Sequence, residues 1–243
     1  MVRHFRFLVA ALAALAVSCR SGPPADSYVP ADTRLVAGFD AVELRASPLR
    51  ETFPPVALFL DTFREAAHLT VAFSGNDFLA IARGRFRTAP AGWTLVEPGV
   101  ALSGPPQKRP SGGPPRFLSK AASVIAGKPI WIVAQGGITL PLTGNAANVN
   151  RLLRDSEFGA VTATLGSQME IEFTAVGRTP EAGRDVEETL RAVLAMIGMA
   201  EKRGSDVAAL LSSVEIHRQD RTVRATVSAN AETVGKLLEP LTR

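Results

Sequence analysis

The chain has few cysteine, histidine and aromatic residues, and each shortage excludes a class of site. Cys19 is its one cysteine, so no disulfide can form within the chain. Beyond the first residues only His68 and His217 occur, with no second histidine at helical spacing from either. A zinc site needs three or four nitrogen, sulfur or carboxylate ligands. We therefore expect no metal site and no cofactor.

Nucleic acid is not an expected partner either. The isoelectric point of about 9.7 suggests one, but Arg3 and Arg6 lie in a segment that we expect to be removed. Without them, 25 basic residues face 23 acidic ones, a net charge of +2. Aromatic residues make up 6% of the chain and are not interleaved with basic ones. The stacking platforms that bind single strands are therefore not expected.

The apolar run from Phe7 to Val17 is too short to cross a bilayer, which takes about 20 residues. A basic start, Met-Val-Arg-His-Phe-Arg, precedes the run, and small residues follow it. This order is typical of a secretory signal peptide. We therefore predict that residues 1–18 are a signal peptide and that the protein is exported.

The residues around the cysteine sharpen this prediction. Leu15-Ala16-Val17-Ser18-Cys19 resembles the lipobox of bacterial lipoproteins, although alanine stands three positions before the cysteine, where the pattern has leucine. The resemblance implies that Cys19 is lipidated on sulfur and anchors the mature chain to a membrane, with residues 19–28 as a polar tether. Arg20 takes the position at which aspartate implies inner-membrane retention. It favours the periplasmic face of the outer membrane, if the host has one. The alternative is an ordinary signal peptide with an incidental cysteine.

Hairpins that alternate with helices predict the fold class. Alternating apolar residues on either side of short turns indicate three hairpins, with turns near residues 74–77, 166–168 and 219–220. The longest helix is expected to open at Thr179-Pro180 and to end near Gly204, with an apolar stripe along one side. These elements predict an α+β protein, a mainly antiparallel sheet with its helices on one face.

The order of strand, helix and hairpin occurs twice, over residues 35–83 and 130–176. The two stretches share this pattern and not their residues, so the duplication is a hypothesis about a pseudo-repeat.

A segment rich in glycine and proline, residues 88–115, is the best internal boundary, with at most a short strand embedded in it. We expect a single body over residues 29–243. The alternative is two subunits, residues 29–88 and 116–243, joined by this segment as a linker.

Several short segments resemble a pattern in uncharacterised bacterial envelope proteins. They are Val-Pro-Ala-Asp-Thr at residues 29–33, Val-Ala-Gly-Phe-Asp at residues 36–40 and Arg-Gly-Arg-Phe at residues 83–86. Pro129-Ile130-Trp131 and the final two-hairpin region are similar to the same group. The resemblance spans most of the mature chain and implies no known activity.

The sequence lacks the motifs of common enzymes. It has no Gly-x-Ser-x-Gly nucleophile elbow. Gly127-Lys128 is not part of a phosphate-binding loop, since the first glycine is missing and Pro129 takes the place of the hydroxyl residue. A hairpin would place His68 roughly 20 Å from Ser74, too far for a shared reaction. We therefore predict no catalytic residue and expect a protein that is not an enzyme.

One asymmetry of charge remains. Between Phe78 and Arg154 the sequence has ten basic residues and a single acid, Glu97. A solvated basic loop is the simple explanation. The more specific hypothesis is a patch that contacts anionic lipid headgroups or cell-wall polymer, where each basic residue contributes about 1 kcal/mol. The residues assigned to this patch are Lys108, Arg109, Arg116 and Lys120.

The sequence therefore predicts a membrane-anchored envelope lipoprotein with a binding or structural role. Its expected partners are the membrane, through lipid on Cys19, and an envelope protein or apolar ligand. The alternative function is a carrier of a lipid or other apolar ligand, held between the long helix at residues 180–202 and a curved sheet.

Overall fold

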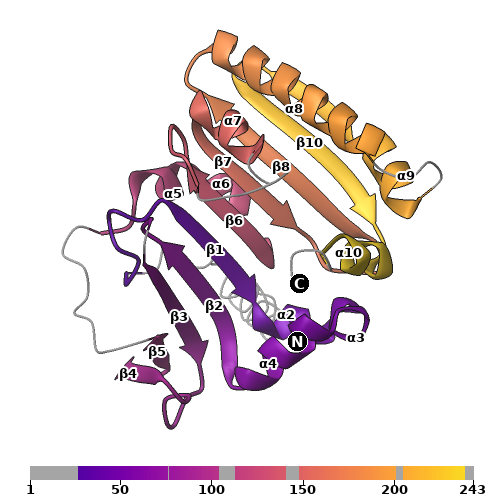
Figure 1. Ribbon diagram of the computed structural model, residues 1–243. Coiled ribbons are helices and arrows are strands. Elements are labelled where there is room, and N and C mark those ends of the chain that lie inside the picture. The colour runs from indigo at the N-terminus through magenta and orange to yellow at the C-terminus, as the bar shows by residue number, and fades with distance from the viewer. Residues whose placement is uncertain (1–26, 76, 104–112, 141–147, 201–204, 239–243) are drawn as a thin grey trace, which may run out of the picture.

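The computed structural model describes residues 27–75, 77–103, 113–140, 148–200 and 205–238. Their central element is one ten-stranded sheet in the order β4-β5-β3-β2-β1-β6-β7-β8-β10-β9 (Figure 1). Every neighbouring pair of strands is antiparallel. The predicted α+β class, with a mainly antiparallel sheet, is confirmed.

The strands of the first half are β1 (Leu35–Asp40), β2 (Ala66–Phe73), β3 (Phe78–Gly84), β4 (Trp93–Glu97) and β5 (Val100–Ser103). Those of the second half are β6 (Ile130–Gln135), β7 (Ser156–Ala163), β8 (Met169–Gly177), β9 (Glu215–Gln219) and β10 (Thr222–Ala229). The described helices are α2 (Ala41–Ala46), α3 (Leu49–Thr52), α4 (Pro54–Thr62), α5 (Arg116–Lys120), α6 (Ala122–Ile125), α7 (Val149–Arg154), α8 (Pro180–Ala200), α9 (Asp206–Ser212) and α10 (Ala231–Leu238).

Local sequence signals explain where several elements begin. The Asp40 carboxylate accepts hydrogen bonds at 2.9 Å from the backbone N–H groups of Val42 and Glu43, so β1 passes directly into α2. Asn230 caps α10 in the same way. The three predicted hairpins are present as β2–β3, β7–β8 and β9–β10. In the last of these, Asp220 adopts φ 53° in the turn.

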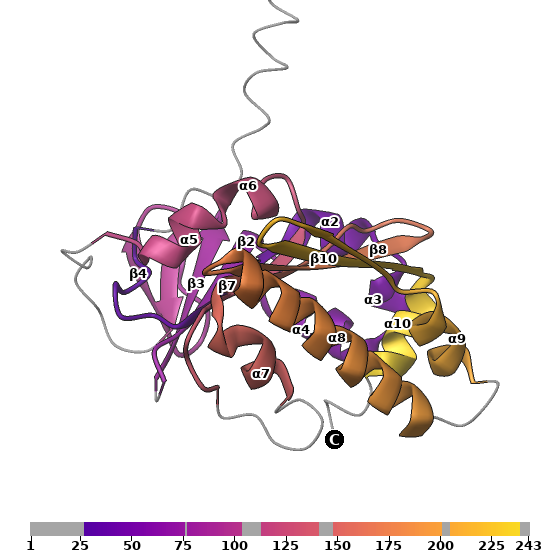
Figure 2. The same cartoon turned by 90° about the horizontal axis from the view of Figure 1, so that it is seen from above.

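The prediction that all helices lie on one face of the sheet is wrong. Phe158 and Ala160 of β7 are buried in a cluster with residues of α5 and α6. A side chain at Gly159, between them, would face the opposite side of the sheet. A Cβ built there would lie 2.8 Å from the Leu153 side chain of α7. Figure 2 shows α5 and α6 on one side of the sheet and α7 and α8 on the other. The two faces are called here the α5 face and the α8 face.

Both faces carry apolar clusters. On the α5 face, Val36, Val133 and Phe117 belong to one buried apolar cluster. The cluster also includes Tyr28 and Val29 from the start of the described chain. The cross-strand pair Gly38 and Trp131 lies on the same face, with the indole ring over the glycine. On the α8 face separate clusters form beneath α2–α4 and beneath α7–α8.

Residues 88–115, the boundary segment that would be a linker if the chain formed two subunits, contain two strands where at most one was expected. β4 and β5 form a hairpin, and β5 pairs with β3 and so extends the sheet. The turn of this hairpin lies close to the end of β3, where the backbone N–H of Gly84 donates to the carbonyl oxygen of Gly99 at 2.9 Å. A composition rich in glycine and proline therefore marks here a short edge hairpin as well as its flanking loops.

Candidate functional site

Part of the predicted basic patch lies in the described structure. Arg116 and Lys120 stand at the two ends of α5, four residues apart, and both are exposed. Side chains at this spacing share one side of a helix. The other predicted site residues lie outside the described residues, and they are Cys19, Lys108 and Arg109.

Arg116 and Lys120 line the same hollow, which is called here the α5 hollow and has a volume of about 790 Å³. It is bordered by the N-terminal segment, α5, the turn after β6, the start of β7 and the residue after β8. Its polar lining residues are Thr33, Arg116, Lys120, Gln135, Glu157 and Arg178. Five segments that are far apart in the sequence therefore supply one surface depression.

The position of α5 follows from its apolar side. Phe117 and Leu118 are 6% and 3% exposed and anchor the helix in the core of the α5 face. Pro115, whose ring fixes its own φ, stands directly before the helix. Because the middle of this five-residue helix is buried, the basic side chains at its two ends remain at the rim of the hollow.

Arg178 reaches the hollow across a glycine turn. Gly136 donates its backbone N–H to the carbonyl oxygen of Glu157 at 2.9 Å, which holds the turn against β7. Gly137 has φ +73°, and a Cβ on it would collide with the guanidinium of Arg178. The Nε of Arg178 lies 3.4 Å from the carbonyl oxygen of Ser156. Gly137 therefore leaves the space in which this arginine lies, and Gly136 allows the turn to approach β7 closely.

Glu157 connects the hollow to a second cation. Its Oε2 accepts from Lys120 Nζ at 2.8 Å, and its Oε1 accepts from Arg221 Nη1 at 2.7 Å. The hydrogen bond from Lys120, joined by the hydrogen bond and charge of Arg221, lowers the pKa of Glu157, against an opposing effect of burial. The carboxylate is therefore ionised at neutral pH and shared by two cations.

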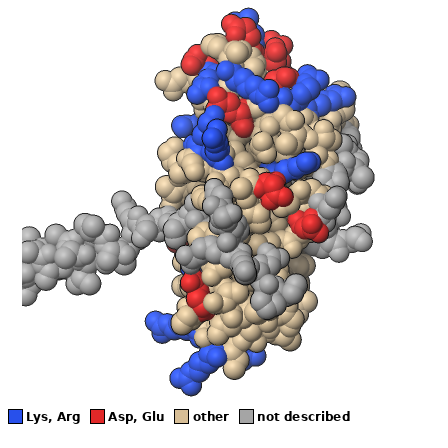
Figure 3. All heavy atoms as spheres, turned by 90° about the vertical axis from the view of Figure 1, so that its left-hand side faces the viewer, with Lys and Arg blue, Asp and Glu red and all other residues tan. Residues whose placement is uncertain are grey.

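A second hollow of about 420 Å³ lies on the other side of this Lys120–Glu157–Arg221 bridge, and Arg224 also lines it. Together the two hollows have five basic lining residues and one acidic lining residue, Glu157. Figure 3 shows lysine and arginine side chains gathered in the upper part of one side of the molecule, with carboxylates among them. The surplus of positive charge favours an anionic ligand.

Thr33 adds an unpaired group to the same wall. The residue is 1% exposed, and its hydroxyl oxygen has no hydrogen-bond partner among the described residues. A buried hydroxyl without a partner costs about 1–3 kcal/mol. Arg116 is equally unoccupied, since no ion pair or hydrogen bond joins its side chain to the described part of the chain. The hollow therefore has donors that the described part of the chain does not use.

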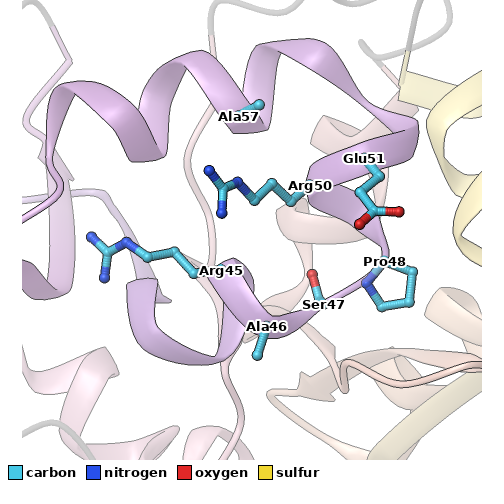
Figure 4. A pocket seen from close by; sticks show the side chains of 7 residues that line it. All are labelled: Arg45, Ala46, Ser47, Pro48, Arg50, Glu51 and Ala57. Atoms are coloured by element: carbon cyan, nitrogen blue, oxygen red, sulfur yellow. The ribbon is translucent and has the colours of Figure 1, made fainter.

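A third hollow, at the corner of α2, α3 and α4, has a different character. Figure 4 shows Arg45 and Arg50 in the space between α2 and α4. Arg45 donates to the carbonyl oxygens of Phe63 and Ala66, at 2.6 and 2.9 Å, and so joins α2 to the end of α4 and the start of β2. Arg50 lies 3.5 Å from Asp61. These arginines already bind groups of the fold, which makes the α5 hollow the better candidate.

The centre of the α8 face presents a row of apolar side chains. Ile132 pairs with Val161 and with Ala37 across the strands, and Val71 and Phe173 continue the row on either side. Ile132 and Val161 are 36% and 37% exposed. Phe173 leads to the cluster beneath α8. The row therefore places partly exposed apolar surface beside the longest helix.

His68 and His217, the histidines of the described residues, each lie beside a single carboxylate. His68 of β2 stands 3.6 Å from Asp40, and the exposed His217 of β9 stands 3.7 Å from Glu215. Within the described residues no group of three or more potential metal ligands occurs. The described helices also include none that is long and apolar enough to span a membrane.

The sequence pointed to Arg116 and Lys120 but not to the residues that complete the hollow. Glu157 and Arg178 lie outside the basic run and are brought to it by the pairing of β6, β7 and β8. Arg221, which lines the second hollow, reaches Glu157 through the pairing of β8 with β10. The one local signal was the pair Gly136-Gly137, which the sequence explains equally well as an ordinary turn.

Comparison with known proteins identifies a shared fold. No protein-family model and no curated protein matches the chain. The solved structure of TP0453 in crystal form I is similar over 92% of this chain and 99% of its own, with a TM-score of 0.50 and 11% sequence identity. Crystal form III of TP0453 gives a TM-score of 0.49 and 10% identity over 88% of this chain and 97% of its own. At 11% identity, the similarity to crystal form I shows a shared fold and nothing more.

Proposed function

We propose that this protein is an exported lipoprotein, anchored through Cys19, whose α+β body binds a partner at the cell envelope and is not an enzyme. One observation supports this most directly. The single thiol of the chain stands at the end of an apolar run of signal-peptide length, eight positions before the first described residue, Ser27. Arg20 supports a place on the periplasmic face of an outer membrane, if the host has one.

Lipidation makes a direct prediction. The Cys19→Ala variant should leave an unprocessed precursor without lipid, and globomycin should leave an unprocessed precursor, so that both migrate more slowly on SDS gels than the mature wild-type protein. Mass spectrometry should find diacylglycerol on the wild-type N-terminus and none on the variant. Ser18→Ala is the matched control, because it keeps a small residue before the cysteine and should be processed normally. A wild-type protein that begins elsewhere and lacks lipid contradicts the proposal.

A second candidate function is the carriage of a lipid or other apolar ligand. The row through Ala37, Ile132 and Val161 supports it, because these side chains form a continuous apolar strip and two of them are partly exposed. Exposed apolar surface of this kind marks binding sites more often than isolated apolar residues do. A ligand lying on the strip would be covered from the side by α8.

Native mass spectrometry of the full chain separates this candidate from a purely structural role. A carrier should co-purify with lipid, and replacing Ile132 and Val161 by threonine should remove it. Threonine keeps the β-branched shape and introduces a hydroxyl, so the strands should remain stable. The control replaces Val42 and Val149 by threonine. These two valines lie outside the row and are 57% and 37% exposed. Lipid retained equally by both double variants argues against a site on the strip.

We also propose that the two halves of the sheet derive from one duplicated unit. Support comes from the strand order, in which β4-β5-β3-β2-β1 mirrors β9-β10-β8-β7-β6 about the antiparallel contact of β1 with β6. Each half begins with a strand, adds a hairpin beside it, and ends with a second hairpin whose later strand lies inside. Related sequences in which the two halves fail to align with each other would count against a common origin.

A further inference from the structure

We propose that the α5 hollow binds the phosphate group of an anionic lipid headgroup and so holds the α5 face against the membrane surface. This inference rests on the proposed lipid anchor, because the anchor brings the hollow to the membrane. It adds a defined site, with Arg178 as a principal ligand residue, to the basic residues that the sequence indicates.

The donor set suits a phosphate. Arg116 approaches from α5, and Arg178 from the junction of β8 and α8, so two guanidinium groups border one hollow from different elements. Guanidinium groups bind phosphate oxygens through paired hydrogen bonds. Gln135 and the nearly buried Thr33 supply neutral donors in the same wall. Neither Arg116 nor the Thr33 hydroxyl has a partner in the described part of the chain.

The balance of charge in the hollow is positive. Its basic lining residues are Arg116, Lys120 and Arg178, and its one acidic lining residue is Glu157. Glu157 faces Lys120 on one side and Arg221 on the other, so its negative charge is shared by two cations. Arg116 and Arg178 therefore keep their charge available to an incoming anion, since neither forms an ion pair with a described carboxylate.

The apolar part of the lining favours a lipid over free phosphate. Ala31, Pro114, Pro115 and Phe117 border the same hollow as the cations. Inorganic phosphate would gain nothing from these side chains, whereas the glycerol and the first acyl carbons of a lipid can pack against them. The combination of cations and apolar surface therefore matches a lipid whose phosphate binds the cations while its glycerol and first acyl carbons contact the apolar side chains.

The position of the N-terminal segment points the hollow toward the membrane. Tyr28 and Val29 are buried in the α5 face beside Phe117, and Ala31 and Thr33 line the hollow itself. Eight residue steps separate Cys19 from Ser27, which can span at most about 28 Å when extended. An anchor on Cys19 thus keeps the hollow near the headgroups, and such tethering raises the effective concentration of the lipid.

The test titrates the full purified chain, in a neutral detergent, with dihexanoyl phosphatidylglycerol and with inorganic phosphate while calorimetry follows binding. We expect saturable binding of the lipid and at least tenfold weaker binding of inorganic phosphate. Arg116→Gln combined with Arg178→Gln should weaken lipid binding at least tenfold. The control combines Arg64→Gln with Arg87→Gln, which removes the same charge from exposed positions outside the hollow, and should stay within twofold of wild type.

Three results would overturn the site. They are equal weakening in both double variants, equal affinity for lipid and inorganic phosphate, and absence of saturable lipid binding at low salt. Arg116→Glu, which changes an exposed side chain that has no partner among the described residues, gives an independent variant and should abolish binding while circular dichroism stays unchanged. Calorimetry with soluble lipid needs no anchor, so a chain that proves not to be lipidated leaves this result interpretable by itself.

Discussion

Replacing Gly38 by alanine should lower the free energy of unfolding by about 3 kcal/mol or more, which is the upper range for overpacking a core. Gly38 lies in the middle of β1, opposite Trp131 of β6. A Cβ at this position would overlap the indole ring and lie 2.5 Å from its Nε1. The ring cannot retreat freely, because Trp131 is 4% exposed and packs in the main cluster of the α5 face.

Urea denaturation of two further variants tests this explanation. In a Trp131→Leu background the Gly38→Ala change should cost less than about 1 kcal/mol, because the ring that the methyl group meets is gone. Gly198→Ala is the control, since a Cβ on this glycine of α8 meets nothing within 4 Å. It should stabilise the protein by up to about 1 kcal/mol through helix propensity. Equal costs of Gly38→Ala in both backgrounds would refute the steric origin.

Local signals in the sequence were enough to locate the hairpins and the main helices. The turn at residues 74–77, the cap at Asn230 and the Thr179-Pro180 start of α8 each depend on residues within one turn of the chain. Such signals depend on residue types that favour a particular backbone geometry or a hydrogen bond to a near neighbour. Those residue types can be read directly from the sequence. Their success extends to the α+β class and to the antiparallel pairing of neighbouring strands.

The distribution of helices over the two faces could not be predicted in the same way. Trp131 faces α5 and α6, whereas its neighbour Ile132 faces the opposite side, and both are apolar. A strand that is apolar on both sides gives no alternation from which to choose a face. The five-residue helix α5 also has too few positions to show a helical period.

Some residues of the candidate site could be predicted from the sequence and others could not. Arg116 and Lys120 were found because they lie in one run of basic residues. Arg178 and Arg221 reach the same region only through the register of β7 against β8 and of β8 against β10. A register is fixed by the burial of whole strands, so no short stretch of sequence reveals which distant cations it will bring together.

Gly136→Ala should have an effect on stability similar to that of Gly38→Ala and should also damage the α5 hollow. A Cβ on Gly136 would overlap the backbone carbonyl of Ser156 and lie 2.7 Å from the carbonyl carbon of Glu157. Backbone cannot move aside as a side chain can. Ser156 is fully buried, and its hydroxyl donates to the carbonyl oxygen of Leu152 at 2.6 Å, so the start of β7 is held in place.

The overlap of the new Cβ with the Ser156 carbonyl can therefore be removed only if the turn after β6 separates from β7. This separation breaks the hydrogen bond from Gly136 N–H to the carbonyl oxygen of Glu157. We expect a loss of about 3 kcal/mol or more in the free energy of unfolding. Binding of dihexanoyl phosphatidylglycerol should weaken as well, because Glu157 and Arg178 border this turn. The control is Gly166→Ala in the β7–β8 loop, where the nearest atom to a Cβ lies 3.3 Å away. It should cost less than about 1 kcal/mol and leave lipid binding unchanged. Equal denaturation midpoints for the two variants would show that the turn and β7 are not held as closely as the structure places them.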